Sequence, residues 1–461
     1  MAQSTTYPPD FIAQLKQQLG AADSDLFFSA LQTPAITSVR INPIKATTKF
    51  NHLPAVAWCP EGRYLKERPL FTADPLFHAG AYYVQEASSM FLAHALKQTL
   101  DTSRPIKALD LCASPGGKST LIASLLNDES LLLANEVIKT RANILAENLV
   151  KWGQLNTFVS NNDPSHFAPL AGFFNLVLVD APCSGEGLFR KDPASIDAWS
   201  LAHVQHCAAR QKRILSDAAL LVQANGLLIY STCTYNPIEN DNNLRYLQEQ
   251  HNFESIALSV PESWGITKTG NDKLHGYQFY PHRTLGEGFF LAVLQKNGGK
   301  VFKSIKKKRH KKESAMGFQP LPAKQAALVA PFLNPDIAVK LLRLNDELYA
   351  IPSTLLSAAT TLQSHLYLKK AGTHLGKLYG TQLLPSHELA LSPLISPNYP
   401  SISVNHSQAL QYLQKKPLSL ATKGKGWHLI RYENYPLGWV KLLDNRMNNY
   451  YPKQWRIRLD L

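Results

Sequence analysis

Several features common in membrane, secreted or disordered proteins are missing from this sequence. It has no run of about 18 apolar residues, so no membrane-spanning helix is expected. Its start, MAQSTTYPPD, lacks the basic residues and the apolar stretch of a secretory signal. It also has no extreme low-complexity tract of the kind that keeps a chain unfolded. We therefore expect a folded, soluble protein of the cytoplasm.

Cysteine is scarce, and its arrangement excludes two roles. The five cysteines are odd in number, scattered along the chain, and include no C-x-x-C pair. A disulfide framework needs pairs and a structural zinc site needs closely spaced ligands, so we expect neither a disulfide scaffold nor a metal. Each thiol must then have its own explanation.

Acidic residues are also in short supply. The chain has 34 Asp and Glu against 48 Lys and Arg, a formal net charge of +14. Such an excess favours an anionic partner, although it can also do no more than keep a protein in solution. Residues 300–312 carry eight Lys or Arg and no acid. This stretch suits a basic linker that contacts phosphates, or a solvated tether with no specific role.

Length and changes in composition predict several domains. A chain of 461 residues is long enough for about three, each with its own core. The predicted segments are an N-terminal α+β unit (1–90), a central α/β domain (91–297), the basic linker (298–314), an intermediate domain (315–395) and a β-rich C-terminal module (396–461).

The central domain alternates short apolar strands with helical segments. This pattern is typical of a Rossmann-like fold, a mostly parallel, doubly wound sheet. The predicted strands are 106–112, 130–136, 156–163, 174–183 and 226–234. Each ends in polar or small residues. Since ligands bind beyond the carboxyl ends of parallel strands, we expect the five ends to meet at one cleft.

The first strand leads into DLCASPGGKST (110–120), which resembles two phosphate-binding loops and matches neither. A Walker loop would need Gly in place of Cys112, and Pro115 removes a backbone donor that would bind phosphate. The dinucleotide motif G-x-G-x-x-G is absent too, yet Gly116 and Gly117 still let a ligand approach the backbone closely. Such a loop fits S-adenosylmethionine (SAM), which contains no pyrophosphate.

Two acids at strand ends suit the same ligand. Glu136 ends the second strand, where a carboxylate can accept hydrogen bonds from both ribose hydroxyls. Asp163 ends the third strand, where an acid can bind the exocyclic amine of adenine. A simple turn aspartate is the alternative interpretation of Asp163.

Two cysteines stand at the ends of the fourth and fifth strands. The fourth strand ends DAPCSG, with Cys183, and the fifth ends STCT, with Cys233. A single cysteine is more often a packing residue, as we expect for Cys207 on the predicted helix 203–222. Two thiols at neighbouring strand ends, beside a proposed SAM site, indicate catalysis.

The chemistry of cytosine explains why two thiols would be needed. Its carbon 5 is too weak a nucleophile to accept a methyl group until a thiolate has added to carbon 6. Asp180 would bind ring nitrogen 3 and the exocyclic amine, and the second thiol would serve as, or organise, the base that removes the carbon 5 proton. The attacking thiol also needs an electropositive pocket, which Lys118 and Arg190 are candidates to supply.

The motifs DLCASPGGKS, ANE, NND, DAPCSGEG and STCTYNPIEN resemble, in order and spacing, those of the Nol/Nop/Sun family of RNA (cytosine-5)-methyltransferases. SVRIN (38–42) and YYVQEASSM (82–90) resemble the family's upstream elements. The resemblance implies that Cys233 is the nucleophile and that Cys183 releases the product. The SAM contacts that it implies are Cys112, Ala113, Ser114, Pro115, Gly116, Gly117, Lys118, Glu136, Arg141, Asp163 and Asp180.

The stretch 426–458 is similar to the PUA-like C-terminal module of bacterial RsmF-type ribosomal RNA enzymes. This similarity implies RNA binding, with ribosomal RNA of the small subunit as the substrate of a monomeric enzyme. The module mixes basic residues with aromatic rings, which suits phosphates and exposed bases, although some rings can instead form the core of a small β-barrel. The rings are those of Trp427, Trp439, Tyr450, Tyr451 and Trp455.

Several alternatives remain open at this level. The substrate can be another RNA, such as tRNA, or the protein can be a non-catalytic ribosome-assembly factor. A DNA cytosine methyltransferase would use the cysteine of its Pro-Cys motif and would not need Cys233. An amino-methyltransferase would carry a tripeptide such as Pro-Pro-Tyr where this sequence has Ala-Pro-Cys.

Overall fold

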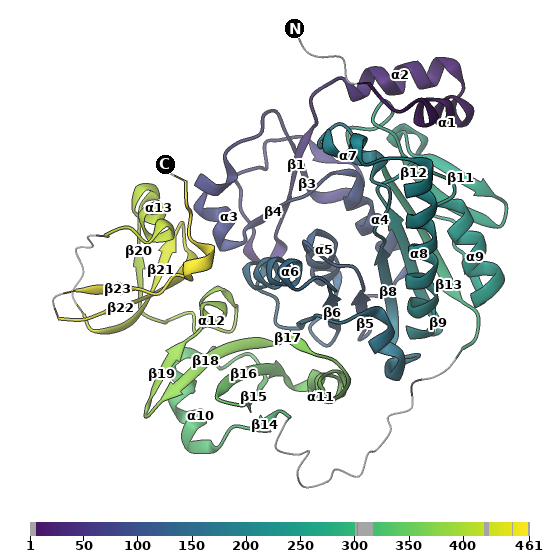
Figure 1. Cartoon of the computed structure of the whole chain (residues 1–461). Helices are drawn as coiled ribbons and strands as arrows, with labels where there is room; N and C mark the ends of the chain where they lie inside the picture. The colour runs from purple at the N-terminus through teal and green to yellow at the C-terminus, as the bar shows by residue number, and fades with distance from the viewer. Residues whose placement is uncertain (1–5, 300–301, 303–316, 419–423, 445, 460–461) are drawn as a thin grey trace.

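The computed structural model describes residues 6–299, 302, 317–418, 424–444 and 446–459 (Figure 1). Four sheets organise this described part of the chain. Most of the predicted basic linker, 298–314, lies outside it.

The N-terminal unit consists of two short helices followed by a small antiparallel sheet of order β2-β3-β1-β4. Its elements are α1 (Pro9–Leu19), α2 (Ala21–Leu31), β1 (Thr37–Ile41), β2 (Ala55–Val56), β3 (Cys59–Leu65), α3 (Pro75–Ala79) and β4 (Tyr82–Val84). The buried face of α1 packs against the central domain, where the ring of Phe11 meets those of Phe189 and Trp199.

The central domain contains the predicted parallel sheet. Five parallel strands lie in the order β9-β8-β5-β6-β7, so the chain winds outward in both directions from β5. They are β5 (Lys107–Asp110), β6 (Leu131–Asn135), β7 (Thr157–Ser160), β8 (Phe174–Asp180) and β9 (Val222–Thr232). The switch point between β5 and β8 is where such sheets bind ligands.

Helices cover both faces of this sheet, as the doubly wound prediction requires. They are α4 (Phe91–Thr99), α5 (Gly117–Leu125), α6 (Lys139–Trp152), α8 (Leu201–Leu221) and α9 (Asp241–His251). The short helix α7 (Ala194–Asp197) packs instead in the cluster that contains α1. Alternate residues of β8 point to opposite faces. Val177 and Val179 join the cluster of α8 and α9, whereas Leu176 and Leu178 join that of α4 and α5. The predicted helix 203–222 is confirmed as α8, and Cys207 on it is fully buried.

The sheet extends beyond the five predicted strands at both edges. On one side β13, β12 and β11 add antiparallel, with β10 pairing to β13. On the other side β17, which comes from the predicted intermediate domain, pairs antiparallel with β7. The bounds are β10 (Phe253–Ser255), β11 (Thr267–Asn271), β12 (Leu274–Phe279), β13 (Phe289–Lys296) and β17 (Leu368–Ala371). The sequence analysis did not foresee β17 in this sheet.

Two further sheets form the rest of the described chain. The intermediate region has the order β14-β15-β16-β18-β19, and the C-terminal module has β20-β21-β22-β23. Their elements are β14 (Gln319–Pro320), α10 (Ala323–Val329), β15 (Val339–Leu344), β16 (Glu347–Pro352), α11 (Leu356–His365), β18 (Thr373–Tyr379), β19 (Gln382–Pro385), α12 (His387–Leu391), β20 (Ser401–Ser403), α13 (His406–Gln414), β21 (Gly426–Tyr432), β22 (Tyr435–Leu442) and β23 (Met447–Asn449).

The C-terminal module lies against the N-terminal unit (Figure 1). Ala79 of α3 is part of the module's own hydrophobic cluster, and His78 hydrogen bonds the hydroxyl of Tyr451. Trp439 and Tyr451 are buried, so these two predicted RNA-facing rings belong to the core. Tyr450 is exposed, and Trp427 and Trp455 are partly buried.

Within the described residues no helix is both long enough and apolar enough to cross a bilayer.

A buried lysine on β17 connects this strand to the central sheet, and substituting it tests how much the connection stabilises the protein. Lys370 Nζ donates to the carbonyl of Thr157 at 3.0 Å and pairs with Glu388 Oε1 at 3.0 Å, and its side chain is 4% exposed. Lys370→Met would leave Glu388 without its cation, at a cost of about 3 kcal/mol. We expect the apparent melting temperature to fall by roughly 5–10 °C in calorimetry. Lys369→Met, which removes the same charge from the more exposed neighbour, should change it by no more than about 2 °C.

Candidate active site

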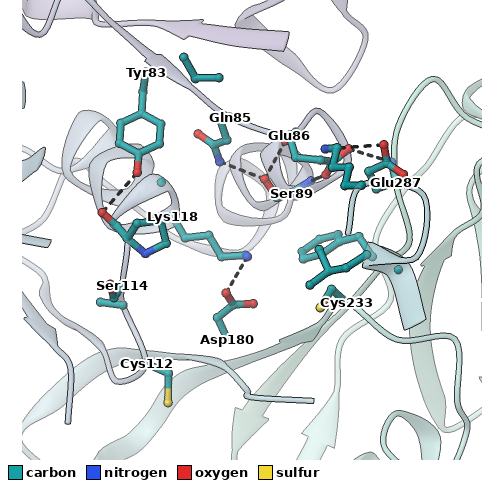
Figure 2. A pocket seen from close by; sticks show the side chains of 18 of the residues that line it. Tyr83, Gln85, Glu86, Ser89, Cys112, Ser114, Lys118, Asp180, Cys233 and Glu287 are labelled. Carbon is teal, nitrogen blue, oxygen red and sulfur yellow. Dashed lines mark hydrogen bonds and ion pairs between the residues drawn. The ribbon is translucent and has the colours of Figure 1, made fainter. Parts of the chain in front are cut away.

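A cavity of about 380 Å³ opens at the switch point between β5 and β8. Three loops that follow strands β5, β8 and β9 form one side of it, and the segment around β4 forms the other (Figure 2). The lining residues are Tyr83, Val84, Gln85, Glu86, Ser89, Asp110, Cys112, Ala113, Ser114, Pro115, Gly117, Lys118, Asp180, Gly187, Leu188, Lys191, Cys233, Glu287, Gly288 and Phe289. Most of the predicted loop 112–118 is therefore brought together with Asp180 and Cys233.

The loop after β5 depends on one glycine for its path. Gly116 has φ +112°, a conformation that costs a residue with a Cβ atom considerable strain, and a Cβ there would lie 3.2 Å from Leu145. Gly117 then begins α5 and lines the cavity. Of the two glycines that the sequence analysis singled out, Gly117 therefore faces the cavity at the helix start, and Gly116 shapes the loop without lining the cavity.

Lys118 and Asp180 form an ion pair across the cavity floor. The Nζ–Oδ2 distance is 2.8 Å, and Ser231 Oγ donates to the other carboxylate oxygen at 2.7 Å. Burial alone would lower the pKa of Lys118, but the attraction of Asp180 outweighs it and raises the pKa above the usual value. The cavity therefore holds a permanent cation beside an anchored carboxylate.

The two predicted cysteines meet behind this pair. Their sulfur atoms are 3.1 Å apart, and both thiols are free. Cys233 lines the cavity, while Cys183 is not among the lining residues. The hydrogen bond to Cys233, together with burial, raises the pKa of Cys183 well above its usual value. Cys183 therefore keeps its proton while Cys233 is free.

A buried carboxylate holds the loop that carries Cys183. Glu239 accepts hydrogen bonds from the backbone N–H of Ser184 at 2.9 Å and from Gln211 Nε2 at 2.8 Å. In addition, the N–H of Gly187 donates to the carbonyl of Cys233 at 2.7 Å. These hydrogen bonds connect the loop that carries Cys183 to the loop that carries Cys233. The backbone conformation of the two loops therefore fixes the short distance between the sulfur atoms.

Asp110, at the end of β5, is a lining residue that the sequence analysis did not assign. Its side chain is fully buried, and Ser119 Oγ donates to Oδ2 at 2.6 Å. The other oxygen, Oδ1, finds no hydrogen-bond partner in the described part of the chain. Burial raises the pKa of Asp110 to about 7. An unpartnered carboxylate oxygen at the cavity wall is suited to a cationic ligand.

The N-terminal unit supplies the opposite wall, with Gln85 and Ser89 (Figure 2). Arg40, in the SVRIN string, is 2% exposed and donates through Nε to Gln85 Oε1 at 2.8 Å and through Nη2 to Thr120 Oγ1 at 2.6 Å. Because Arg is an obligate donor, the Gln85 amide must turn its nitrogen toward Ser89. In the sequence, only the resemblance of SVRIN and YYVQEASSM to upstream family elements indicated that the N-terminal unit contributes to the site.

Four predicted SAM contacts lie outside the cavity lining: Gly116, Glu136, Arg141 and Asp163. Arg141 Nη2 donates to the carbonyl of Ser114 at 3.1 Å, and Arg141 Nε lies 3.6 Å from Glu136 Oε2, so both residues flank the loop. Asp163 accepts from the backbone N–H of Ser165 at 3.0 Å, the contact that the turn interpretation predicts. A SAM role for these four residues stays a prediction, as it does for the predicted contacts that line the cavity.

The prediction that Arg190 makes the pocket electropositive is wrong. Arg190 is not a lining residue, and its Nε lies 3.0 Å from Glu287 Oε2 with both side chains 4% exposed. Its charge is neutralised by this buried pair. Lys191, the next residue, lines the cavity and lies 3.6 Å from Glu287 Oε1.

Family models match three stretches of the chain. The model described as 16S rRNA methyltransferase RsmB/F matches residues 97–295. The N-terminal domain of 16S rRNA methyltransferase RsmF matches residues 7–87, and the methyltransferase RsmF PUA domain matches residues 399–457.

Relatives match nearly the whole length. A protein of Escherichia coli O17:K52:H18 named ribosomal RNA small subunit methyltransferase F is 30% identical, over 98% of this chain and 98% of its own. A protein of the same name from Shewanella loihica is 28% identical, over 93% of this chain and 91% of its own.

Solved structures resemble the central part. A methyltransferase homolog from Pyrococcus horikoshii is 26% identical with a TM-score of 0.51, and it covers 63% of this chain and 99% of its own. NSun6 from the same organism, determined with SFG, has a TM-score of 0.53 at 21% identity, covers 64% of this chain and 99% of its own, and shares the fold.

Fold, cavity and matches together define a methyltransferase that ends in a PUA domain. The chain belongs to the ribosomal RNA small subunit methyltransferase F family. The resemblance to RsmF-type enzymes stated from the sequence is confirmed.

The contact between the two sulfur atoms can be tested chemically. Because Cys183 and Cys233 are 3.1 Å apart, mild oxidation with diamide should join them before any other pair. The protein's mass should fall by that of two hydrogen atoms, and peptide mapping should find the two residues linked. Cys207→Ala should give the same product and Cys183→Ser none. A linkage elsewhere, or free thiols after treatment, would contradict this geometry.

Proposed function

We propose that this protein methylates carbon 5 of a cytosine in ribosomal RNA of the small subunit, through a covalent bond between Cys233 and the base. The observation that carries the proposal is the pair of sulfur atoms 3.1 Å apart, next to the Lys118–Asp180 ion pair. A packing role for cysteines explains neither the position of Cys233 in the cavity lining nor the second thiol in contact with it.

The cavity suits S-adenosylmethionine. Loop 112–118 offers open backbone without a phosphate cradle, and the free Oδ1 of Asp110 matches a ligand with an ammonium and a sulfonium group. We assign the loop, Asp110 and Asp180 to its binding, with Glu136, Arg141 and Asp163 as outer contacts. When bound, SAM supplies the methyl group that the cytosine ring accepts.

In this mechanism Cys233 attacks as a thiolate. A bond forms between its sulfur and carbon 6, and the electron pair of the 5,6 double bond moves to carbon 5 and into the ring. Asp180 holds the exocyclic amine, and Lys118 offsets the negative charge that develops at nitrogen 3 and oxygen 2. The ion pair between them keeps both side chains in place before the base arrives.

Release requires loss of the carbon 5 proton and cleavage of the bond between sulfur and carbon 6. We assign the proton transfer to Cys183, acting as or organising the base. The main cause of its raised pKa is the hydrogen bond to Cys233. Once the Cys233 sulfur is bonded to carbon 6 this contribution weakens while burial remains, so the pKa of Cys183 falls. Cys183 then loses its own proton to solvent and, as a thiolate, takes the carbon 5 proton, or it orients a water that does so. Elimination then restores the ring and the free Cys233 thiolate.

Ribosomal RNA is favoured over other substrates by the names of the relatives and by the matched PUA domain. A DNA enzyme would not need Cys233, and a non-catalytic assembly factor would not need the paired thiols. We propose a cytoplasmic monomer, with the N-terminal unit (1–90) and the C-terminal module (396–461) as its RNA-binding parts.

The roles of the two cysteines can be separated by variants. Cys183→Ala should accumulate a covalent protein–RNA species that survives denaturing electrophoresis, because attack proceeds while release fails. Cys233→Ala should form no such species and should lose at least about 10³-fold in methylation rate. Bisulfite sequencing of the RNA identifies the modified base.

Two outcomes would contradict the proposal. If Cys183→Ala abolished the covalent species and Cys233→Ala retained it, the DNA-type assignment of the nucleophile would hold instead. If the wild-type protein bound RNA and SAM but left every cytosine unmodified, the protein would be a binding factor.

The role of Asp110 predicts a pH dependence of SAM binding. Burial sets the pKa of Asp110 near 7, so its carboxyl gains a proton, and loses its charge, as the pH falls below 7. Affinity for the cationic ligand should therefore decrease about tenfold between about pH 8 and about pH 6 in calorimetry. Asp110→Asn should bind SAM more weakly at pH 8 and with little dependence on pH. An unchanged pH profile in the variant would exclude this role.

A further inference from the structure

A second cavity, of about 290 Å³, lies where the N-terminal unit, helix α6 and the C-terminal module meet. Its apolar wall includes Phe77 of the first, Ile144 of the second and Trp455 of the third. Ile144, on α6, is 50% exposed and offers apolar surface to the cavity. Three parts of the chain that are distant in sequence thus build one apolar recess.

Cations surround this recess. Lys151 Nζ lies 5.4 Å from the ring centres of both Phe77 and Trp455, and Glu147 balances its charge at 2.6 Å. Arg456 and Arg458 line the cavity and are exposed, and they make no ion pair or hydrogen bond among the described residues. The recess therefore combines apolar surface with two guanidinium groups that have no partner within residues 446–459 or the other described ranges, which suits a planar base linked to a phosphate.

The neighbourhood of Arg456 has an excess of positive charge. Burial, and then the nearby charges of Lys453 and Arg456, lower the pKa of Lys415. Lys415 itself donates to the carbonyls of Asn449 and Tyr451 rather than to an acid. An anion placed among these cations would relieve their mutual repulsion.

One residue separates this cavity from the candidate active site. Asn148 lines the second cavity, and its Nδ2 donates to the carbonyl of Pro115 at 2.8 Å and to the hydroxyl of Tyr83 at 3.4 Å. Pro115 and Tyr83 both line the first cavity. The two cavities are therefore close together. If one nucleotide of an RNA strand occupies the first cavity, another nucleotide a short distance along the strand can reach the second cavity.

We propose that the second cavity binds a nucleotide of the RNA substrate close to the methylated cytosine, with its base against Ile144, Phe77 and Trp455 and its phosphate held by Arg456 and Arg458. This inference rests on the proposed function, because it takes RNA as the substrate. It gives the PUA domain a defined task, which is to hold the strand at a fixed distance from Cys233.

The first test removes the two guanidinium groups. The probe is small-subunit ribosomal RNA transcribed without modifications, and the variant is Arg456→Ala with Arg458→Ala. Loss of two phosphate contacts should weaken RNA binding about tenfold and reduce the slope of log affinity against log salt by about 1.4. SAM affinity and melting temperature should stay at wild-type values, since both side chains are exposed and pair with no residue in the part of the chain that the structure describes.

The matched control is Arg210→Ala with Arg245→Ala, which removes the same charge from exposed positions on α8 and α9, on the side of the molecule away from the C-terminal module (Figure 1). RNA affinity and salt slope equal to those of this control would overturn the inference. Wild-type protein that neither binds nor methylates this RNA would instead overturn the proposed function.

The second test locates the strand directly. RNA carrying 4-thiouridine within a few nucleotides of the modified cytosine is irradiated in complex with the Cys183→Ala protein, in which the covalent species fixes the target base. Crosslinks should map to peptides containing Ile144 or Trp455. Crosslinks confined to other peptides would show that the flanking RNA takes another path and would refute the inference.

Discussion

The register between β8 and β9 is the constraint on which the rest of the site depends. Asp180 pairs with Ser231 across these parallel strands, and the Ser231 hydroxyl also donates to the Asp180 carboxylate. The two strands therefore end side by side, and the loops that follow bring the sulfur atoms of Cys183 and Cys233 into contact. Because side chains alternate along a strand, a shift of one residue would turn Ser231 away from Asp180 and separate the thiols.

The second wall of the cavity depends on a buried arginine that pairs with no carboxylate among the described residues. Arg40 donates hydrogen bonds to Gln85, Thr120 and the carbonyl of Gly117. Its guanidinium lies 4.5 Å from the ring centre of Trp152. It joins the N-terminal sheet to the first turn of α5. The N-terminal unit is therefore part of the site, since the same guanidinium positions an amide of one wall and the helix start of the other.

The features that could be predicted from the sequence are those determined by short motifs and by local periodicity. The strand-end residues Asp180 and Cys233 meet as expected because parallel strands end at one edge of a sheet. Asp110 was missed because its free oxygen depends on burial, which no motif reports. Arg190 was misassigned because its partner, Glu287, lies far away in the sequence. The pairing of β17 with β7 was missed for the same reason: a short apolar strand carries no signal for which sheet it joins.

That last pairing affects how the chain can fold during its synthesis. Strand β7 is at the edge of the catalytic sheet until Leu368–Ala371 have emerged from the ribosome and closed it. An uncovered, apolar edge strand is a template for pairing with other chains. A nascent or shortened polypeptide that stops after β13 would carry every residue of the catalytic motifs and yet expose this edge to aggregation. The intermediate region therefore covers the β7 edge of the central sheet and protects it against pairing with other chains.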